Sequence, residues 1–228
     1  MANLTVPRDL YARDRFEPGL PPAVVTFLGC CEYFADRMAS GTARGEKWVY
    51  SNNSIYVPQA TSFDEMTASG HFGANCAMIS NWALMDVGAM PDGTRFWGDV
   101  TGGFANRDKV MPLLDPAVVL YDLHDSRPTF EELSDEGRVR PGDIFLCNLH
   151  TFVYRGNRTF YACGHETRWH TDPDAYTEDP AKAVFETWIM DVDACGNRSC
   201  RVNFLLRLRD DWAPARYRRS HGVRVALT

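Results

Sequence analysis

The 228-residue sequence lacks several features that would place a protein in a class at once. It has no apolar run near the roughly 18 residues of a membrane-spanning helix, and its first residues lack the apolar core of a secretory signal. Lys and Arg total 24 against 30 Asp and Glu, so the net charge is −6 and there is no basic surplus to attract nucleic acid. These absences predict a protein that is cytoplasmic at synthesis and binds neither membrane nor nucleic acid.

The cysteine pattern argues against a disulfide framework. There are seven cysteines, an odd number, and no Cys-x-x-Cys spacing. A zinc site is an alternative because thiols and imidazoles gather late in the chain, but their spacings match no common structural zinc pattern. We therefore expect no metal and no cofactor, and a Cys195–Cys200 disulfide stays open for an oxidising compartment. The residues that the zinc alternative would use are Cys163, His165, His170, Cys195 and Cys200.

Composition and length predict one folded domain. Hydrophobic residues make up 45% and charged residues 24% of the chain, a mixture typical of globular proteins. Residues 1–20 are polar and are expected to form an arm, with a single domain over residues 21–228. Apolar residues recur at three- and four-residue spacing over residues 21–40, which predicts a helix. A second helix is expected over residues 75–88, and residues 42–74 between them are expected to form a long shaped loop.

The second half of the chain has strand patterns. Residues 144–154 and 159–163 are strand-like, and Gly156-Asn157 between them predicts a tight hairpin. Residues 184–192 and 201–208 are expected to form another hairpin. Helices followed by an antiparallel sheet indicate an α+β fold. Two weaker elements are expected in the loop-rich stretch before the sheet, a short strand at Val118–Leu123 and a helical turn at Phe130–Leu133.

Cys76 is the candidate nucleophile. Asn75 is a good N-cap, so Cys76 is expected in the first turn of the second helix, where backbone N–H groups and the helix dipole favour a thiolate. A catalytic thiolate also needs an imidazole partner, and His150 is the leading candidate because a strand can hold it against a helix end. By itself this pairing is weakly specific, and a buried structural thiol is the ordinary alternative.

Three motifs in order resemble the NlpC-type cell-wall cysteine peptidases, which are papain-like. The block from Asn75 to Gly88 is similar to the family's nucleophile helix, Pro141-Gly142-Asp143 to its Pro-Gly-Asp strand, and His150–Asn157 to its His strand and turn. The helix at 21–40 followed by Trp48-Val49-Tyr50 also fits. The resemblance covers about residues 21–165. It implies a papain-like α+β fold and hydrolysis of an amide bond in the stem peptides of peptidoglycan.

The resemblance also assigns roles. Cys76 would attack the carbonyl, and His150 would hold the proton and pass it to the leaving amine. A Tyr ahead of the nucleophile helix often lines the substrate groove in this family, which suggests Tyr56 and Tyr50, and His71 lies shortly before Cys76. These three residues are the expected substrate-binding set.

The chain departs from the family pattern at several positions. Asn75 and Ala77-Met78 replace the usual Asp and Ser-Gly, and Ala162 stands where the third polar residue is expected. Ala cannot orient an imidazole, so His165, another residue or a backbone carbonyl must do so. We take His165 as the candidate.

Two alternatives stay open. One is a cysteine amidase or acyltransferase on a substrate outside the wall, which the acidic net charge favours. The other is a catalytically degenerate protein that binds wall fragments or another protein. A phage or prophage lysin would reach the wall when the producing cell lyses, which fits the missing signal. The sequence does not indicate an oligomeric state.

Overall fold

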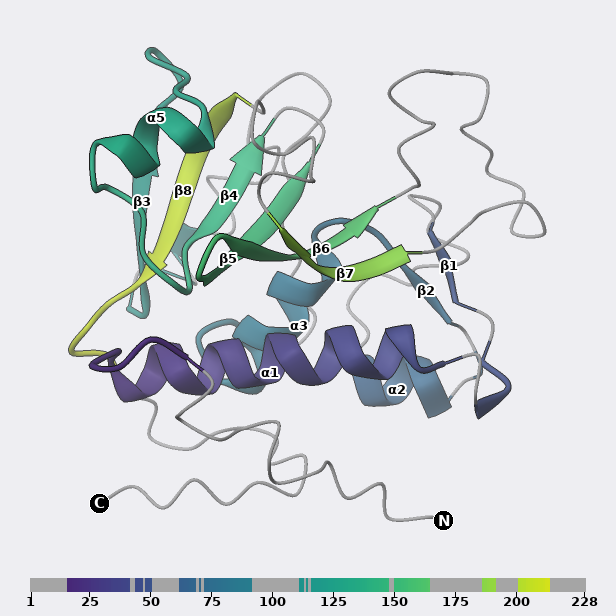
Figure 1. Ribbon diagram of the computed structural model, residues 1–228. Helices are drawn as coiled ribbons and strands as arrows, with labels where there is room; N and C mark the ends of the chain where they lie inside the picture. The colour runs from purple at the N-terminus through teal and green to yellow at the C-terminus, as the bar shows by residue number, and fades with distance from the viewer. Residues whose placement is uncertain are drawn as a thin grey trace, which may run out of the picture.

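The computed structural model describes the part of the chain that forms the helices and the sheet (Figure 1). No helix in this part is both long and apolar enough to cross a membrane. The residues described are 16–41, 44–46, 48–50, 62–68, 70, 72–91, 111–112, 114, 116–147, 150–164, 186–191 and 201–213.

A six-stranded antiparallel sheet is the centre of the fold. Its strand order is β3-β8-β4-β5-β6-β7, and a separate parallel pair is formed by β1 (Val49–Tyr50) and β2 (Gly73–Ala74). Helices together with an antiparallel sheet confirm the predicted α+β class. The strands of the large sheet are β3 (Val118–Asp122), β4 (Ile144–Cys147), β5 (Thr151–Gly156), β6 (Thr159–Gly164), β7 (Glu186–Asp191) and β8 (Val202–Leu208).

Helices lie beside the strands in the part of the chain that the structure describes. The 18-residue α1 (Pro22–Ala39) confirms the helix expected from the apolar stripe at 21–40, and Pro22 occupies its first turn, where a missing N–H costs nothing. It runs along one side of the sheet and packs against α3, β6 and β7 (Figure 1). Further helices among the described residues are α2 (Phe63–Ala68), α3 (Met78–Asp86) and α5 (Phe130–Asp135).

Strand alternation divides the core into two clusters. Ile144 and Leu146 of β4 join an α1-side cluster, whereas Phe145 and Cys147 between them join an α5-side cluster, because successive side chains point to opposite faces. The α1-side cluster contains, among others, Phe27, Phe34, Phe63, Trp82, Val153, Tyr161 and Leu206. The α5-side cluster is Leu123, Phe130, Leu133, Phe145, Cys147, Phe152, Phe160, Val202 and Leu205.

Aromatic side chains fix α3 in place. Trp82 is buried, with its ring centroid 5.0 Å from Phe63 and 5.7 Å from Phe34, both in edge-on geometry. Edge-on aromatic pairs add to the free energy gained by burial, so α3 is held against both α1 and α2. The position of the turn that precedes α3 follows from this packing.

The hairpin between β5 and β6 is as expected from the sequence. Asn157 and Arg158 have φ angles of 49° and 57°, and Gly156 pairs with Thr159 across the turn. Positive φ at both central residues is the conformation whose twist matches a two-residue hairpin. The expected short strand and helical turn are also confirmed, as β3 and α5.

Three expectations about the elements were wrong. Residues 144–154 form two antiparallel strands, with Cys147 N–H donating to the His150 carbonyl at 2.8 Å across the connection. β7 and β8 do not form a hairpin, because β7 pairs with β6 while β8 lies between β3 and β4. Within 42–74, expected as a loop, β1, α2 and β2 form. Pairing between distant segments decides where β7 and β8 lie in the sheet, and local patterns do not encode it. The β4–β5 connection and α2 instead rest on contacts within a few residues.

Glu46 anchors the segment after α1 and gives a pH prediction. Its side chain is 10% exposed and accepts hydrogen bonds from Arg37, Arg44 and, at 3.1 Å, the Trp48 indole. Burial alone would raise its pKa, but these donors outweigh burial and lower it. A carboxyl whose pKa is lower in the folded than in the unfolded state stabilises the fold at pH values above its unfolded pKa of about 4.3. This contribution is lost as the pH falls through the folded-state pKa.

We therefore expect the free energy of unfolding to fall from pH 6 to pH 3 less steeply in Glu46→Gln than in the wild type. Urea unfolding at each pH, followed by circular dichroism, measures both slopes. Parallel curves for the two proteins over this range would contradict the prediction.

Candidate functional site

Cys76 lies in a turn that leads into α3. Asn75 Oδ1 accepts a hydrogen bond from the Ala77 N–H at 3.1 Å, and the Asn75 carbonyl accepts one from the Met78 N–H at 3.1 Å. The regular helix begins at Met78, so it starts later than expected, but Asn75 closes the turn as a capping residue would. Cys76 therefore lies in the turn just before the helix N-cap, Ala77, and not in the first helical turn as expected.

Exposure separates Cys76 from three other thiols of the described residues. Cys30, Cys31 and Cys147 are buried, whereas Cys76 is partly exposed and packs against the edge of the α1-side cluster. Burial, reinforced by the charge of Asp86, raises the pKa of Cys30 well above its usual value. Cys30 therefore stays a protonated, shielded thiol, while Cys76 is open to a reagent or substrate.

The Asn75 side chain carries an unpaired donor next to this thiol. Asn75 is fully buried, and its Nδ2 makes no hydrogen bond within the described residues. A buried donor left unpaired costs about 1–3 kcal/mol. Such groups are uncommon in native proteins, and a functional role is one accepted reason for keeping one.

His150 lies directly before β5 and is partly exposed. Its ring centroid is 5.8 Å from that of Phe152, a member of the α5-side cluster. Cys76 packs against the other cluster, so the packing neighbours of the two groups belong to opposite faces of the sheet. Both groups sit at the ends of their elements, and the contact between Cys76 and His150 stays a prediction.

The Pro-Gly-Asp turn before β4 is tightly held. Gly142 has φ of +92°, and a Cβ there would lie 2.8 Å from Val24 Cγ1, so glycine is required for both conformation and space. The Gly142 N–H donates to the Tyr154 carbonyl at 2.8 Å, and the Tyr154 N–H donates to the Asp143 carbonyl at 2.9 Å. The turn therefore sets the register between β4 and β5, the strand that begins directly after His150.

Asp143 is buried and joins this turn to β8. Its carboxylate accepts hydrogen bonds from Arg207 Nε at 2.7 Å and Nη2 at 2.6 Å, and from the Arg140 backbone N–H at 2.9 Å. Burial raises the pKa of Asp143, and the Arg207 guanidinium opposes that rise. Asp143 lies 64 residues before Arg207, so this pair joins segments that are distant in the chain.

A second buried carboxylate joins the helical layer to the hairpin. Glu32 of α1 accepts hydrogen bonds from Arg155 Nε of β5 at 3.0 Å and from the Tyr161 hydroxyl of β6. Burial, together with the negative charge of Glu32, raises the pKa of Tyr161 well above its usual value, so its hydroxyl stays a donor. Sequence reasoning missed this cluster, although a Glu inside the apolar stripe of 21–40 was a signal for it.

The remaining predicted residues divide into two groups. Tyr50 of β1 pairs with Ala74 of β2, two residues before Cys76, so its backbone lies beside the approach to the candidate nucleophile. Tyr56, His71 and His165 lie outside the described residues, as do the zinc candidates other than Cys163 in β6. The roles suggested for all of these side chains stay predictions.

Comparison with known proteins adds no relative. No family model, no curated protein and no solved structure matches this chain.

Proposed function

We propose that the protein is a papain-like cysteine hydrolase that cleaves an amide bond in peptidoglycan stem peptides. The observation that carries this is Cys76, a partly exposed thiol in the Asn75-closed turn before α3, while Cys30, Cys31 and Cys147 are buried. The ordered motifs give further support, because the Pro-Gly-Asp turn fixes the strand that begins after His150.

The proposed reaction has two stages. The Cys76 thiolate attacks the amide carbonyl, the C–N bond breaks, and imidazolium at His150 gives its proton to the leaving amine. Water, deprotonated by His150, then attacks the thioester, and the C–S bond breaks to release the acid and restore the Cys76 thiolate beside the His150 imidazolium. The Cys76 backbone N–H would stabilise the oxyanion, His165 would orient the imidazole, and Tyr50, Tyr56 and His71 would line the substrate groove.

The same thiol supports a second candidate. A net charge of −6 slows approach to an anionic cell wall, which favours an amidase or acyltransferase acting on another substrate. Both candidates require an activated Cys76, whereas a degenerate binding protein does not. As a wall hydrolase the protein would reach its substrate by lysis of the producing cell or by another release route.

The first test is the rate at which iodoacetamide alkylates each cysteine between pH 5 and pH 9, read by peptide mass spectrometry. We expect Cys76 to react well below the pH given by a free thiol pKa of about 8.5, and to lose this reactivity in His150→Ala. Cys30 is the internal control, because its burial keeps it protonated and shielded.

His124→Ala is the matched control variant, since His124 is an exposed histidine in the turn after β3. Loss of Cys76 reactivity in both variants would point to a general structural effect. A Cys76 titration with an ordinary thiol pKa, unchanged in His150→Ala, would reject the thiolate–imidazolium pair and favour the binding protein.

A further inference from the structure

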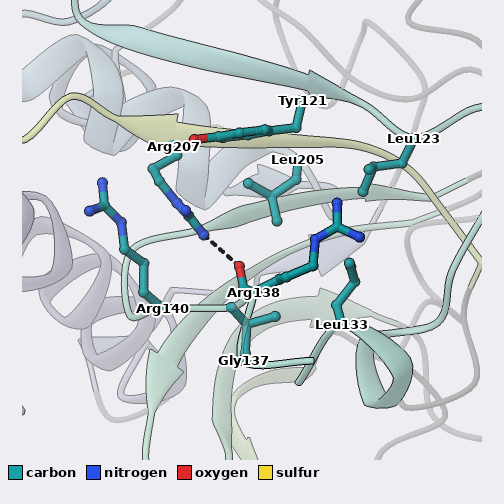
Figure 2. Close-up of a pocket in the computed structure, with 9 residues that line it drawn as sticks. Tyr121, Leu123, Leu133, Gly137, Arg138, Arg140, Leu205 and Arg207 are labelled. Atoms are coloured by element: carbon teal, nitrogen blue, oxygen red, sulfur yellow. Dashed lines mark hydrogen bonds between the residues drawn. The ribbon is translucent and has the colours of Figure 1, made fainter. Parts of the chain in front are cut away.

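A pocket of about 310 Å³ lies between α5, the segment that follows it, and strands β3 and β8 (Figure 2). Its volume is within the range of small-molecule sites. None of the motifs used for the proposed function contributes its side chains to it. The lining residues are Tyr121, Leu123, Leu133, Gly137, Arg138, Val139, Arg140, Leu205 and Arg207.

One part of the lining is apolar. Leu123, Leu133 and Leu205 are buried members of the α5-side cluster that also face the pocket. Tyr121 of β3 is 39% exposed, the large hydrophobic side chain most open to solvent among the described residues. Covering Tyr121 with an apolar group would be favourable, because it removes exposed surface from water, whereas the three leucines are already buried.

The charged part of the lining is entirely cationic, with three arginines and no carboxylate. Two of the three donate to groups that do not line the pocket. Arg207 is held by Asp143, and Arg140 donates to Asp210 Oδ1 at 2.5 Å and to the Leu208 carbonyl at 2.6 Å. Figure 2 shows the Arg140 side chain extending away from that of Arg138.

Arg138 is the cation that a ligand can engage. Its guanidinium projects between Leu123 and Leu133 (Figure 2), and its partner is Glu136, at 3.0 Å, with side chains 48% and 56% exposed. Ion pairs this exposed are weak, because water screens them. Within the described residues, Arg138 Nε and Nη2 make no hydrogen bond, so two donors in fork geometry are open to a planar anion.

We propose that this pocket binds a monocarboxylate with an apolar body, its carboxylate paired with Arg138 and its body against Leu205 and Tyr121. One available guanidinium matches one negative charge, whereas a phosphate dianion would bring a charge that nothing in the lining balances. The ligand is either a small free acid or the C-terminal residue of a peptide. This site does not depend on Cys76 chemistry.

The test is an NMR titration of the full chain with N-acetyl-leucine and with N-acetyl-leucinamide, which differ in the carboxylate. We expect the acid to bind with a Kd of about a millimolar and to shift resonances of residues 121–139. The amide should bind at least about tenfold more weakly, since the charge-assisted pair is lost. In Arg138→Gln the acid should bind no better than the amide.

Arg158→Gln is the matched control, because Arg158 is also 48% exposed and pairs with Glu131 on the surface. Equal loss in Arg158→Gln, equal binding of acid and amide, or tighter binding of inorganic phosphate would each overturn the proposal. A second pair of ligands identifies the source. Tighter binding of acetyl-Gly-Gly-Leu than of 4-methylpentanoate supports a peptide C-terminus, and the reverse order supports a free acid.

Discussion

Replacing Cys76 with serine is expected to lower the rate of stem-peptide cleavage by about 10³-fold or more. Serine keeps the shape of the side chain, but its hydroxyl stays protonated at neutral pH and the helix end cannot convert it into a comparable nucleophile. Cys76 is partly exposed and its turn is closed by Asn75, so the fold should be retained. Release of new amine groups from purified peptidoglycan measures the rate.

His150→Ala should cause a loss of similar size, and the double variant should be no slower than the poorer single variant. Groups that act as one catalytic unit give such non-additive losses, whereas independent effects multiply. His124→Ala should cleave at the wild-type rate. Full activity in Cys76→Ser would show that the thiol is not the nucleophile. A double variant whose rate loss equals the product of the two single losses would show that His150 acts independently of Cys76.

Asp143→Ala is expected to reduce the free energy of unfolding by about 3 kcal/mol, the lower end of the range for breaking a buried ion pair. The carboxylate is fully buried and binds two guanidinium nitrogens of Arg207 as well as the Arg140 backbone N–H. Its removal leaves the Arg207 guanidinium without its carboxylate partner. The Arg207 side chain is 19% exposed, and this access to water keeps the loss of stability at the lower end of the range. Urea unfolding of both proteins at pH 7 measures the difference.

Asp210→Ala provides the comparison on the same sheet. Asp210 also accepts a hydrogen bond from an arginine, Arg140, but it is 67% exposed, so the expected loss is below about 1 kcal/mol. Arg207→Ala combined with Asp143→Ala should lose less than the sum of the single variants, because the two residues share one interaction. Equal losses in Asp143→Ala and Asp210→Ala would contradict the importance of burial.

The Asp143 prediction concerns how the strand that begins after His150 is positioned. The Asp143–Arg207 pair holds the turn that fixes β4 against β5, and Glu32 bonds to the β5–β6 hairpin from the helical side. Because α1 also packs against α3, the helix that Cys76 precedes, the helical layer and the hairpin are joined by polar as well as apolar contacts. The candidate catalytic groups therefore lie at the ends of well-anchored elements.

Local patterns in the sequence determined the elements that depend on near neighbours. The apolar stripe predicted α1, the Gly156-Asn157 pair predicted the β5–β6 hairpin, and Asn75 predicted the turn that presents Cys76. Each rests on backbone conformation or on hydrogen bonds within a few residues. The sequence therefore determined the α+β class and the place of the candidate thiol within it.

Tertiary structure alone decided which distant segments meet. It placed β8 between β3 and β4, paired Arg207 with Asp143, and assembled the Arg138 pocket from α5 and two strands. It also assigned Cys76 and His150 to neighbours on different faces of the sheet. These outcomes depend on burial and charge pairing between residues far apart in the chain, whose energies a local pattern does not contain.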